Sequence, residues 1–176
     1  MYQGQKVRFR AVEPSDAPAF TRWLNDFETV LDISGDGRMP MSEAEERDYI
    51  MRNSYNTFAI ETLDGRLIGN CQFFAVDHQS RTCRIGILIG EKSARNQGYG
   101  ADAMKLLLDF LFNHKNMHRV GLEVFAYNAP AIALYEKLGF TREITYREHA
   151  FAMGRYWDEY GYSMLKEEYE EKYGNR

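Results

Sequence analysis

Apolar and polar residues alternate in some segments of this chain and recur at helical spacing in others. Val7 and Phe9 alternate with arginines, which predicts an opening strand over Val7–Ala11. The run Ile85-Gly86-Ile87-Leu88-Ile89 is continuously apolar, as in a strand buried on both faces. After Gly98-Tyr99-Gly100, one helical face collects the apolar residues Ala101, Met104, Leu108, Leu111 and Phe112. The order is therefore a strand, a glycine-rich turn and a helix.

The same patterns place the remaining elements. Further strands are expected at 57–62, 67–76, 81–89, 119–125, 141–151 and 155–165, with turns at Asp64-Gly65 and Met153-Gly154. Helices are expected from Glu13, from a capping box at Ser42 to about Asn53, from Gly98 to about Asn113, and from Asn128 to Gly139. We expect 25–41 to be irregular and the charged tail, 166–176, to be a frayed helix. A helix joins the fourth and fifth strands, so these two should be parallel in a mixed α/β sheet.

Bulk properties narrow the class of protein. The 176 residues predict a single domain over 1–176, with a core over about 7–165. A net charge of −4 argues against nucleic acid as the main partner. We expect no membrane span and no signal-type apolar stretch at the N-terminus. Cys71 and Cys83 lack metal or redox spacing, so we read them as buried reduced thiols of a cytoplasmic protein.

The glycine-rich turn has the features of an anion site. Two glycines expose backbone N–H groups at the start of a helix, where the helix dipole is positive. Arg95 adds a cation just before them. These groups suit a di-anion such as a pyrophosphate.

Two motifs identify a family resemblance. Arg95-Asn96-Gln97-Gly98-Tyr99-Gly100 matches the R/Q-x-x-G-x-G/A acetyl-CoA signature of the GNAT superfamily of N-acetyltransferases. The segment from Asn128 to Phe140, NAPAIALYEKLGF, resembles that family's N-x-x-A-i-x-l-Y-e-k-l-G-F block. The ending Gly154–Tyr160 resembles the branch of ribosomal-protein N-terminal acetyltransferases and spermidine acetyltransferases.

The resemblance implies a fold, a cosubstrate and a reaction. The fold would be a single GNAT-type α/β (α+β) domain, whose twisted, mostly antiparallel sheet has about seven strands, a splayed parallel pair and helices on both faces. The reaction would move an acetyl group from acetyl-CoA to a primary amine by direct attack in a ternary complex, with a protein N-terminus or a polyamine favoured as acceptor. No metal is implied, and the family's frequent dimers imply that a homodimer can form. The implied acetyl-CoA contacts are Ile87, Leu88, Ile89, Arg95, Asn96, Gln97, Gly98, Tyr99, Gly100 and Asn128.

Tyr135 is the candidate general acid. A phenol stays protonated at neutral pH and can give its proton to a leaving thiolate. The alternative is that Tyr135 only packs between Ile132 and Leu138.

The general base is less defined by the sequence. Many family members carry a Glu on the fourth strand where this chain has Arg84. We take Glu123 as the catalytic candidate, because it is a carboxylate in an otherwise apolar strand. An ion pair of Glu123 with Arg84 or Arg119 is the alternative. The other candidates are Asp26, Glu28, His149 and a chain of waters.

Acidic and aromatic residues are the candidate acceptor contacts. Asp26 and Glu28, with Asp32 and Asp36, could bind a cationic amine, or they could form a solvated acidic loop. Trp157 lies on the last strand beside the expected acceptor pocket, although aromatic residues at strand spacing more often belong to a core.

Three rival interpretations are open to test. A GNAT fold could bind acyl-CoA without catalysis, as a sensor or interaction module. Gly98–Ala103 also fits the dinucleotide pattern G-x-G-x-x-A, but an arginine-containing loop separates it from its strand. His114 and His118 are four residues apart with a helix end between them, which disfavours a shared metal.

Overall fold

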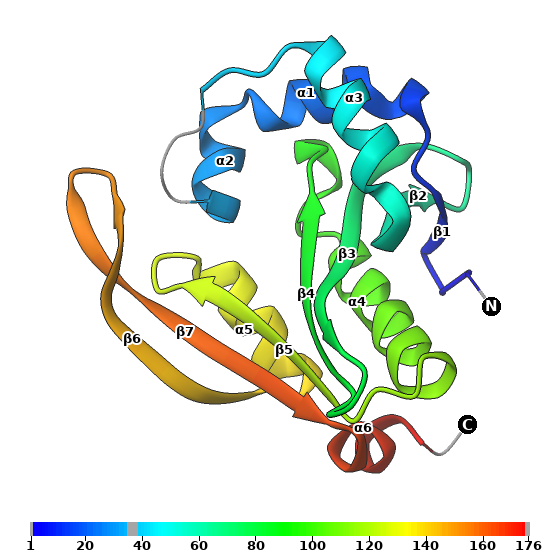
Figure 1. Ribbon diagram of the computed structural model, residues 1–176, viewed down its shortest axis with the longest axis vertical. Helices are drawn as coiled ribbons and strands as arrows, with labels where there is room; N and C mark the ends of the chain where they lie inside the picture. Colours follow the sequence, from blue (N-terminus) through cyan, green and yellow to red (C-terminus); the bar gives the residue numbers. More distant parts are fainter. Residues whose placement is uncertain (1, 35–38, 175–176) are drawn as a thin grey trace. The chain divides into compact units, whose positions relative to one another are not determined.

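The computed structural model describes residues 2–34 and 39–174 (Figure 1). The strands are β1 (Val7–Ala11), β2 (Thr57–Thr62), β3 (Leu67–Asp77), β4 (Thr82–Ile89), β5 (Arg119–Phe125), β6 (Thr141–Ala152) and β7 (Arg155–Leu165). The α-helices are α1 (Ala17–Leu24), α2 (Phe27–Ser34), α3 (Glu43–Asn53), α4 (Tyr99–Asp109), α5 (Ala129–Leu138) and α6 (Lys166–Tyr173). Four shorter helical segments are η1 (Pro14–Asp16), η2 (Ser54–Asn56), η3 (Lys92–Ala94) and η4 (Phe110–His114), the last a π-helical turn.

The strands form one seven-stranded mixed sheet in the order β1-β2-β3-β4-β5-β7-β6. The β4–β5 pair is parallel, as expected from the helix that connects these strands. Its register begins at Thr82 opposite Arg119 and ends at Arg84 opposite Gly121, although β4 continues to Ile89 and β5 to Phe125. The fold is therefore the α/β class that the sequence predicts, with a parallel pair whose pairing stops early.

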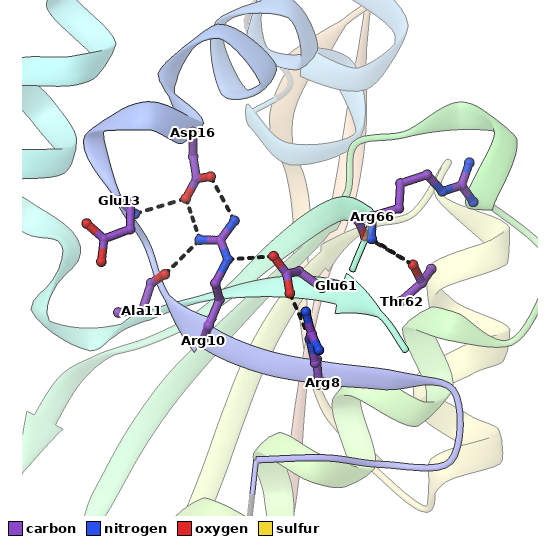
Figure 2. A network of polar contacts seen from close by, with 8 residues as sticks. All are labelled: Arg8, Arg10, Ala11, Glu13, Asp16, Glu61, Thr62 and Arg66. Atoms are coloured by element: carbon purple, nitrogen blue, oxygen red, sulfur yellow. Dashed lines mark hydrogen bonds and ion pairs between the residues drawn. The ribbon is translucent and has the colours of Figure 1, made fainter. Parts of the chain in front are cut away.

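The chain forms two compact units, of which the first comprises residues 1–72 and 87–106. Its core includes the buried residues Val12, Ala17, Phe20, Trp23, Ile50 and Ala59. An ionic network ties β1 to β2 and η1 (Figure 2). Arg10 pairs with Glu61 at 2.6 Å and with Asp16 at 2.7 Å, and Arg8 pairs with Glu61 at 2.8 Å. Glu61 is 7% exposed, so these arginines satisfy a carboxylate that burial alone would destabilise.

The second unit comprises residues 73–86 and 107–176. Strands β6 and β7 form a long hairpin in it (Figure 1). The turn of this hairpin lies at Met153 and Gly154, both with positive φ. The tail helix α6 packs its buried Tyr169 on Phe112, with ring centroids 4.8 Å apart. The Tyr169 hydroxyl also donates to Asp109 at 3.0 Å.

Most element bounds agree with the sequence prediction, and two do not. Strands β2, β5 and β7 have the predicted bounds, the Ser42 capping box forms, and Gly139 ends α5 with φ 95°. The prediction of irregular chain over 25–41 is wrong for Phe27–Ser34, which forms α2. The predicted helix in the tail forms as α6 over Lys166–Tyr173, but the expectation that it is frayed is corrected, because its Tyr169 is buried.

Candidate active site

The glycine turn, Arg95–Gly100, leads into α4. Asn96 has φ 59° and Gly98 has φ 83°, and glycine adopts such positive values without steric cost. The N–H of Asp102 donates to the carbonyl of Gly98 at 3.1 Å, which closes the first turn of the helix. The N–H groups before Asp102 have no acceptor within the helix and lie at the positive end of its dipole. The glycine turn thus presents donors of the kind that bind phosphate.

Arg95 is engaged within the protein. Its Nε donates to the carbonyl of Ile89 at 2.9 Å, and its Nη2 donates to the Thr29 hydroxyl at 2.8 Å. Asp32 lies 3.8 Å from its Nη1. Arg95 therefore braces the glycine turn against β4 and α2, and its expected contact with a phosphate stays a prediction.

Lys6 and Asp102 are neighbours of the glycine turn that sequence reasoning missed. The Lys6 ammonium donates to the carbonyl of Gln97 at 2.7 Å. The Asp102 carboxylate accepts three backbone hydrogen bonds, from Gln5 at 3.2 Å, Lys6 at 2.7 Å and Val7 at 3.1 Å. More than 90 residues separate these partners along the chain, so no local pattern in the sequence signals them.

The last residues of β4 are apolar but only half-buried. Ile87, Leu88 and Ile89 are all partly exposed, whereas Ile85 is 4% exposed. Gly69 lies close to this stretch, because an added Cβ there would be 2.0 Å from the Leu88 carbonyl oxygen. The expected acetyl-CoA contacts of these three residues stay predictions.

The predicted acidic cluster is neutralised by basic side chains. The Lys92 ammonium pairs with Asp26 at 2.9 Å and with Glu28 at 2.8 Å. Asp26 also caps α2, accepting from the N–H of Thr29 at 3.1 Å and from its hydroxyl at 2.6 Å. The bonds from Thr29 and Lys92 lower the pKa of Asp26 to about 2. Asp26 and Glu28 thus already form an ammonium site, which Lys92 occupies.

The other two members of that cluster differ. Burial raises the pKa of Asp32, although the nearby Arg95 acts in the opposite direction. Asp36 lies outside the described residues.

Tyr135 lies on α5 and is buried, with 8% exposed. Its ring centroid is 6.0 Å from that of Phe140 and 6.3 Å from that of Tyr162. Burial raises the pKa of Tyr135 to about 12, so the phenol keeps its proton at neutral pH. Among the described residues, none hydrogen bonds to the Tyr135 hydroxyl, which leaves its proton available for donation.

Asn128 and Trp157 have structural contacts of their own. The Asn128 side-chain oxygen caps α5 by accepting from the N–H of Ala131 at 3.2 Å. The Trp157 indole donates to the carbonyl of Ala152 at 3.0 Å, and the Arg155 guanidinium lies 3.5 Å from the Trp157 ring centroid. Their roles toward cosubstrate and acceptor stay predictions.

The candidate bases differ in their partners. The Glu123 carboxylate forms an ion pair with Arg84, which is the alternative that the sequence left open. His149 lies on β6 with its Nδ1 2.6 Å from Glu159, and its side chain is 61% exposed. A carboxylate at Nδ1 fixes the ring and leaves Nε2 to exchange protons. Of these two candidates, His149 has the geometry of an oriented base.

In 2–34 and 39–174, no three His, Cys, Asp or Glu side chains gather as a metal site. None of the helices described is long and apolar enough to cross a membrane.

Comparison with known proteins gives a clear family match. The acetyltransferase (GNAT) domain family matches residues 6–141. The SPbeta prophage-derived uncharacterized N-acetyltransferase YokL of Bacillus subtilis is 27% identical over 177 residues, covering 98% of this chain and 97% of YokL. The spermidine N(1)-acetyltransferase of Vibrio cholerae is 28% identical over 121 residues, covering 69% of each chain.

Solved structures agree on the fold. The spermidine N-acetyltransferase of Vibrio cholerae in complex with CoA and spermine aligns with a TM-score of 0.82 at 24% identity, covering 93% of this chain and 97% of that one. The acetyltransferase (GNAT family) of Bacillus anthracis aligns with a TM-score of 0.82 at 23% identity, covering 94% and 98%.

Proposed function

The chain belongs to the GNAT family of N-acetyltransferases, and we propose that it moves the acetyl group of acetyl-CoA to a primary amine of a polyamine or a protein N-terminus. The observation that carries this proposal is the glycine turn at the start of α4, with Gly98 at φ 83°. The amine attacks the thioester directly, in a complex that holds both substrates.

The residues present fit the phosphates of CoA. The glycine turn offers N–H groups at a helix start, the chemistry that phosphate oxygens require. Gly98 has φ 83°, a conformation that residues with a side chain rarely adopt, and an added Cβ would lie 3.2 Å from the Lys6 ammonium, a tight contact. Ile87, Leu88 and Ile89 give an apolar, half-buried strand for the arm that carries the thioester. When bound, acetyl-CoA supplies an activated acetyl group on a thiol leaving group.

Tyr135 is the proposed general acid. Its phenol is buried and protonated, and it gives a proton to the sulfur as the carbon–sulfur bond breaks. A backbone N–H near Ile89 is the proposed donor to the oxyanion that forms at the carbonyl.

The amine must lose a proton before or during attack. The Glu123 carboxylate is engaged in its ion pair with Arg84, whereas the ring of His149 is exposed and is oriented by Glu159 through Nδ1. We therefore propose His149, with Glu159 as its orienting carboxylate, ahead of Glu123 for this role.

A cationic acceptor agrees with the two carboxylates at the start of α2, Asp26 just before the helix and Glu28 in its first turn. Asp26 and Glu28 already hold the ammonium of Lys92 at 2.9 and 2.8 Å, and the ammonium groups of a polyamine have the same chemistry. Two spermidine N(1)-acetyltransferases, from Vibrio cholerae and Escherichia coli, are among the relatives, at 28% and 30% identity.

Thiol release from acetyl-CoA tests the proposal. The acceptors would be spermidine, spermine, peptides with Ser, Ala or Met at their N-termini, and an aminoglycoside as the competing class. Release above background with a polyamine or a peptide is expected. Release only with the aminoglycoside would overturn the proposed acceptor class. Binding of CoA with no release for any amine would support the sensor alternative.

A further inference from the structure

We infer that Lys6 is a positioning residue for the phosphate-binding donors of the glycine turn, an inference that rests on the proposed use of acetyl-CoA. Lys6 lies immediately before β1 and is exposed. It bonds to both ends of the segment from Gln97 to Asp102. Its ammonium donates to the carbonyl of Gln97 at 2.7 Å, and its backbone N–H donates to Asp102 at 2.7 Å.

The bond to Gln97 acts on the Gly98 N–H through one peptide group. In a trans peptide, the C=O of Gln97 and the N–H of Gly98 point in opposite directions. A cation that holds the carbonyl therefore directs the N–H away from itself. The same cation polarises the peptide and strengthens that N–H as a donor.

The bonds to Asp102 remove an obstacle to anion binding. Asp102 lies in the first turn of α4, where an uncompensated carboxylate would repel a phosphate. Three backbone donors, from Gln5, Lys6 and Val7, compensate this carboxylate and hold it toward the lead-in to β1. They leave the helix dipole to act on a ligand.

The segment that precedes β1, residues 2–6, is itself held by backbone hydrogen bonds, so the backbone of Lys6 has a defined position. The N–H of Gly4 donates to the carbonyl of Val7 at 2.8 Å, and the N–H of Phe9 donates to the carbonyl of Tyr2 at 2.7 Å. An added Cβ at Gly4 would lie 2.4 Å from a carboxylate oxygen of Asp102, so close approach there requires glycine. Arg95, the cation of the sequence motif, donates to Ile89 and Thr29. The carbonyl of Gln97 instead accepts from the Lys6 ammonium.

The test compares three variants by titration calorimetry with CoA. Lys6→Met removes the ammonium and is expected to weaken CoA binding about tenfold, as for the loss of one charge-assisted hydrogen bond. Lys6→Arg keeps a cationic donor and should stay within about twofold of the unmodified protein. Lys105→Met is the matched control, since it removes an exposed lysine of α4 that lies outside the segment from Arg95 to Gly100.

A second donor separates positioning from a general effect on the fold. Acetyl-pantetheine lacks the phosphates of CoA. The kcat/KM for this donor should therefore be equal in Lys6→Met and in the unmodified protein. The melting temperature without ligand should also be equal in Lys6→Met and Lys105→Met.

Three results would overturn the inference. One is CoA affinity in Lys6→Met equal to that in Lys105→Met, and another is an equal loss with acetyl-pantetheine. The third is absence of CoA binding in the unmodified protein, which would overturn the proposed cosubstrate and this inference together. The first two results leave the proposed function standing.

Discussion

Arg95 donates a hydrogen bond of 2.8 Å from Nη2 to the hydroxyl of Thr29, and the same hydroxyl donates to Asp26 at 2.6 Å. Thr29 is fully buried, so water does not compete for these bonds. The glycine turn and the capped start of α2 are therefore connected through one hydroxyl group. Substitutions of Thr29 should therefore alter both the stability of α2 and the affinity for the cosubstrate.

Replacing Thr29 with valine tests this connection. Thr29→Val keeps the shape but removes the hydroxyl, leaving Arg95 and Asp26 each without one partner. We expect a loss of about 1–3 kcal/mol in the free energy of unfolding, measured in urea. Thr141→Val, at an exposed position on β6, should change stability by less than about 0.5 kcal/mol. Equal stability of the two variants would contradict a role for the Thr29 hydroxyl.

Replacing Tyr135 with phenylalanine tests the general acid. The ring and its packing on Phe140 are kept, while the proton donor is lost. We expect kcat to fall by roughly 10²–10⁴ with the melting temperature little changed. Full turnover in Tyr135→Phe would remove this residue from catalysis and leave it as packing.

The raised pKa of Tyr135 gives an independent check at alkaline pH. The folded value is about 12 and the ordinary value is 10.0, so the folded state holds the proton more tightly. This contribution to stability is present below pH 10 and is lost as the pH rises from 10 through 12. Unfolding followed over that range should show a steeper loss of stability in the unmodified protein than in Tyr135→Phe. Parallel curves would contradict the effect of burial.

Paired substitutions separate the candidate bases. His149→Gln removes the proposed proton acceptor, whose ring Glu159 contacts, and we expect a loss in kcat of roughly 10²-fold or more. Glu123→Gln removes only the partner of Arg84, so kcat should fall by less than about threefold, within the range of a surface ion pair. The opposite order of effects would assign the base to Glu123.

The lowered pKa of Asp26 predicts how stability depends on pH in acid. Its folded value is about 2, below the ordinary 3.8, so its contribution is present above pH 3.8 and is lost as the pH falls toward 2. Asp26→Asn keeps a good helix cap but cannot ionise. The stability difference between the two proteins should therefore shrink between pH 5 and pH 2. A difference that stays constant over this range would contradict the account of Asp26.

Lys92→Met tests whether Asp26 and Glu28, the two carboxylates at the start of α2, bind the acceptor. Without Lys92, Asp26 and Glu28 lose their internal ammonium and become available to an external one. We expect the KM for spermidine to fall by about threefold, because partly exposed ion pairs contribute little binding free energy. Lys105→Met controls for net charge. An unchanged or raised KM in Lys92→Met would place the acceptor elsewhere.

Local patterns were sufficient for the strands and for the turn that carries the motif. The alternation in Thr57–Thr62 and the cap at Ser42 need only near neighbours, so their bounds could be read from the sequence. The missed helix α2 is rich in β-branched residues, and its start depends on a side chain outside it, since Asp26 bonds to Thr29. Helix propensity counts the β-branched residues against a helix but does not include the stabilising cap from Asp26.

Contacts between distant residues explain the other misses. The charged tail gave no sign that Tyr169 would pack on Phe112, so order in α6 could not be predicted. Lys6 and Gln97 are 91 residues apart, so no local pattern in the sequence indicates their contact. The motif itself contains Arg95, which is the cation that the sequence predicts for the turn. The family pattern identified where a phosphate could bind but not which side chains hold the turn in place.

The most direct test of the central claim is calorimetric titration of CoA into the unmodified protein and into Gly98→Val. Gly98 has φ 83°, a value that valine adopts only with strain, so the variant should distort the donors of the glycine turn. We predict binding by the unmodified protein with a Kd of roughly 1 µM to 1 mM, the usual range for enzyme substrates, and at least about tenfold weaker binding by Gly98→Val. Absence of binding by the unmodified protein, or equal affinity in both, would contradict acetyl-CoA recognition by Arg95–Gly100.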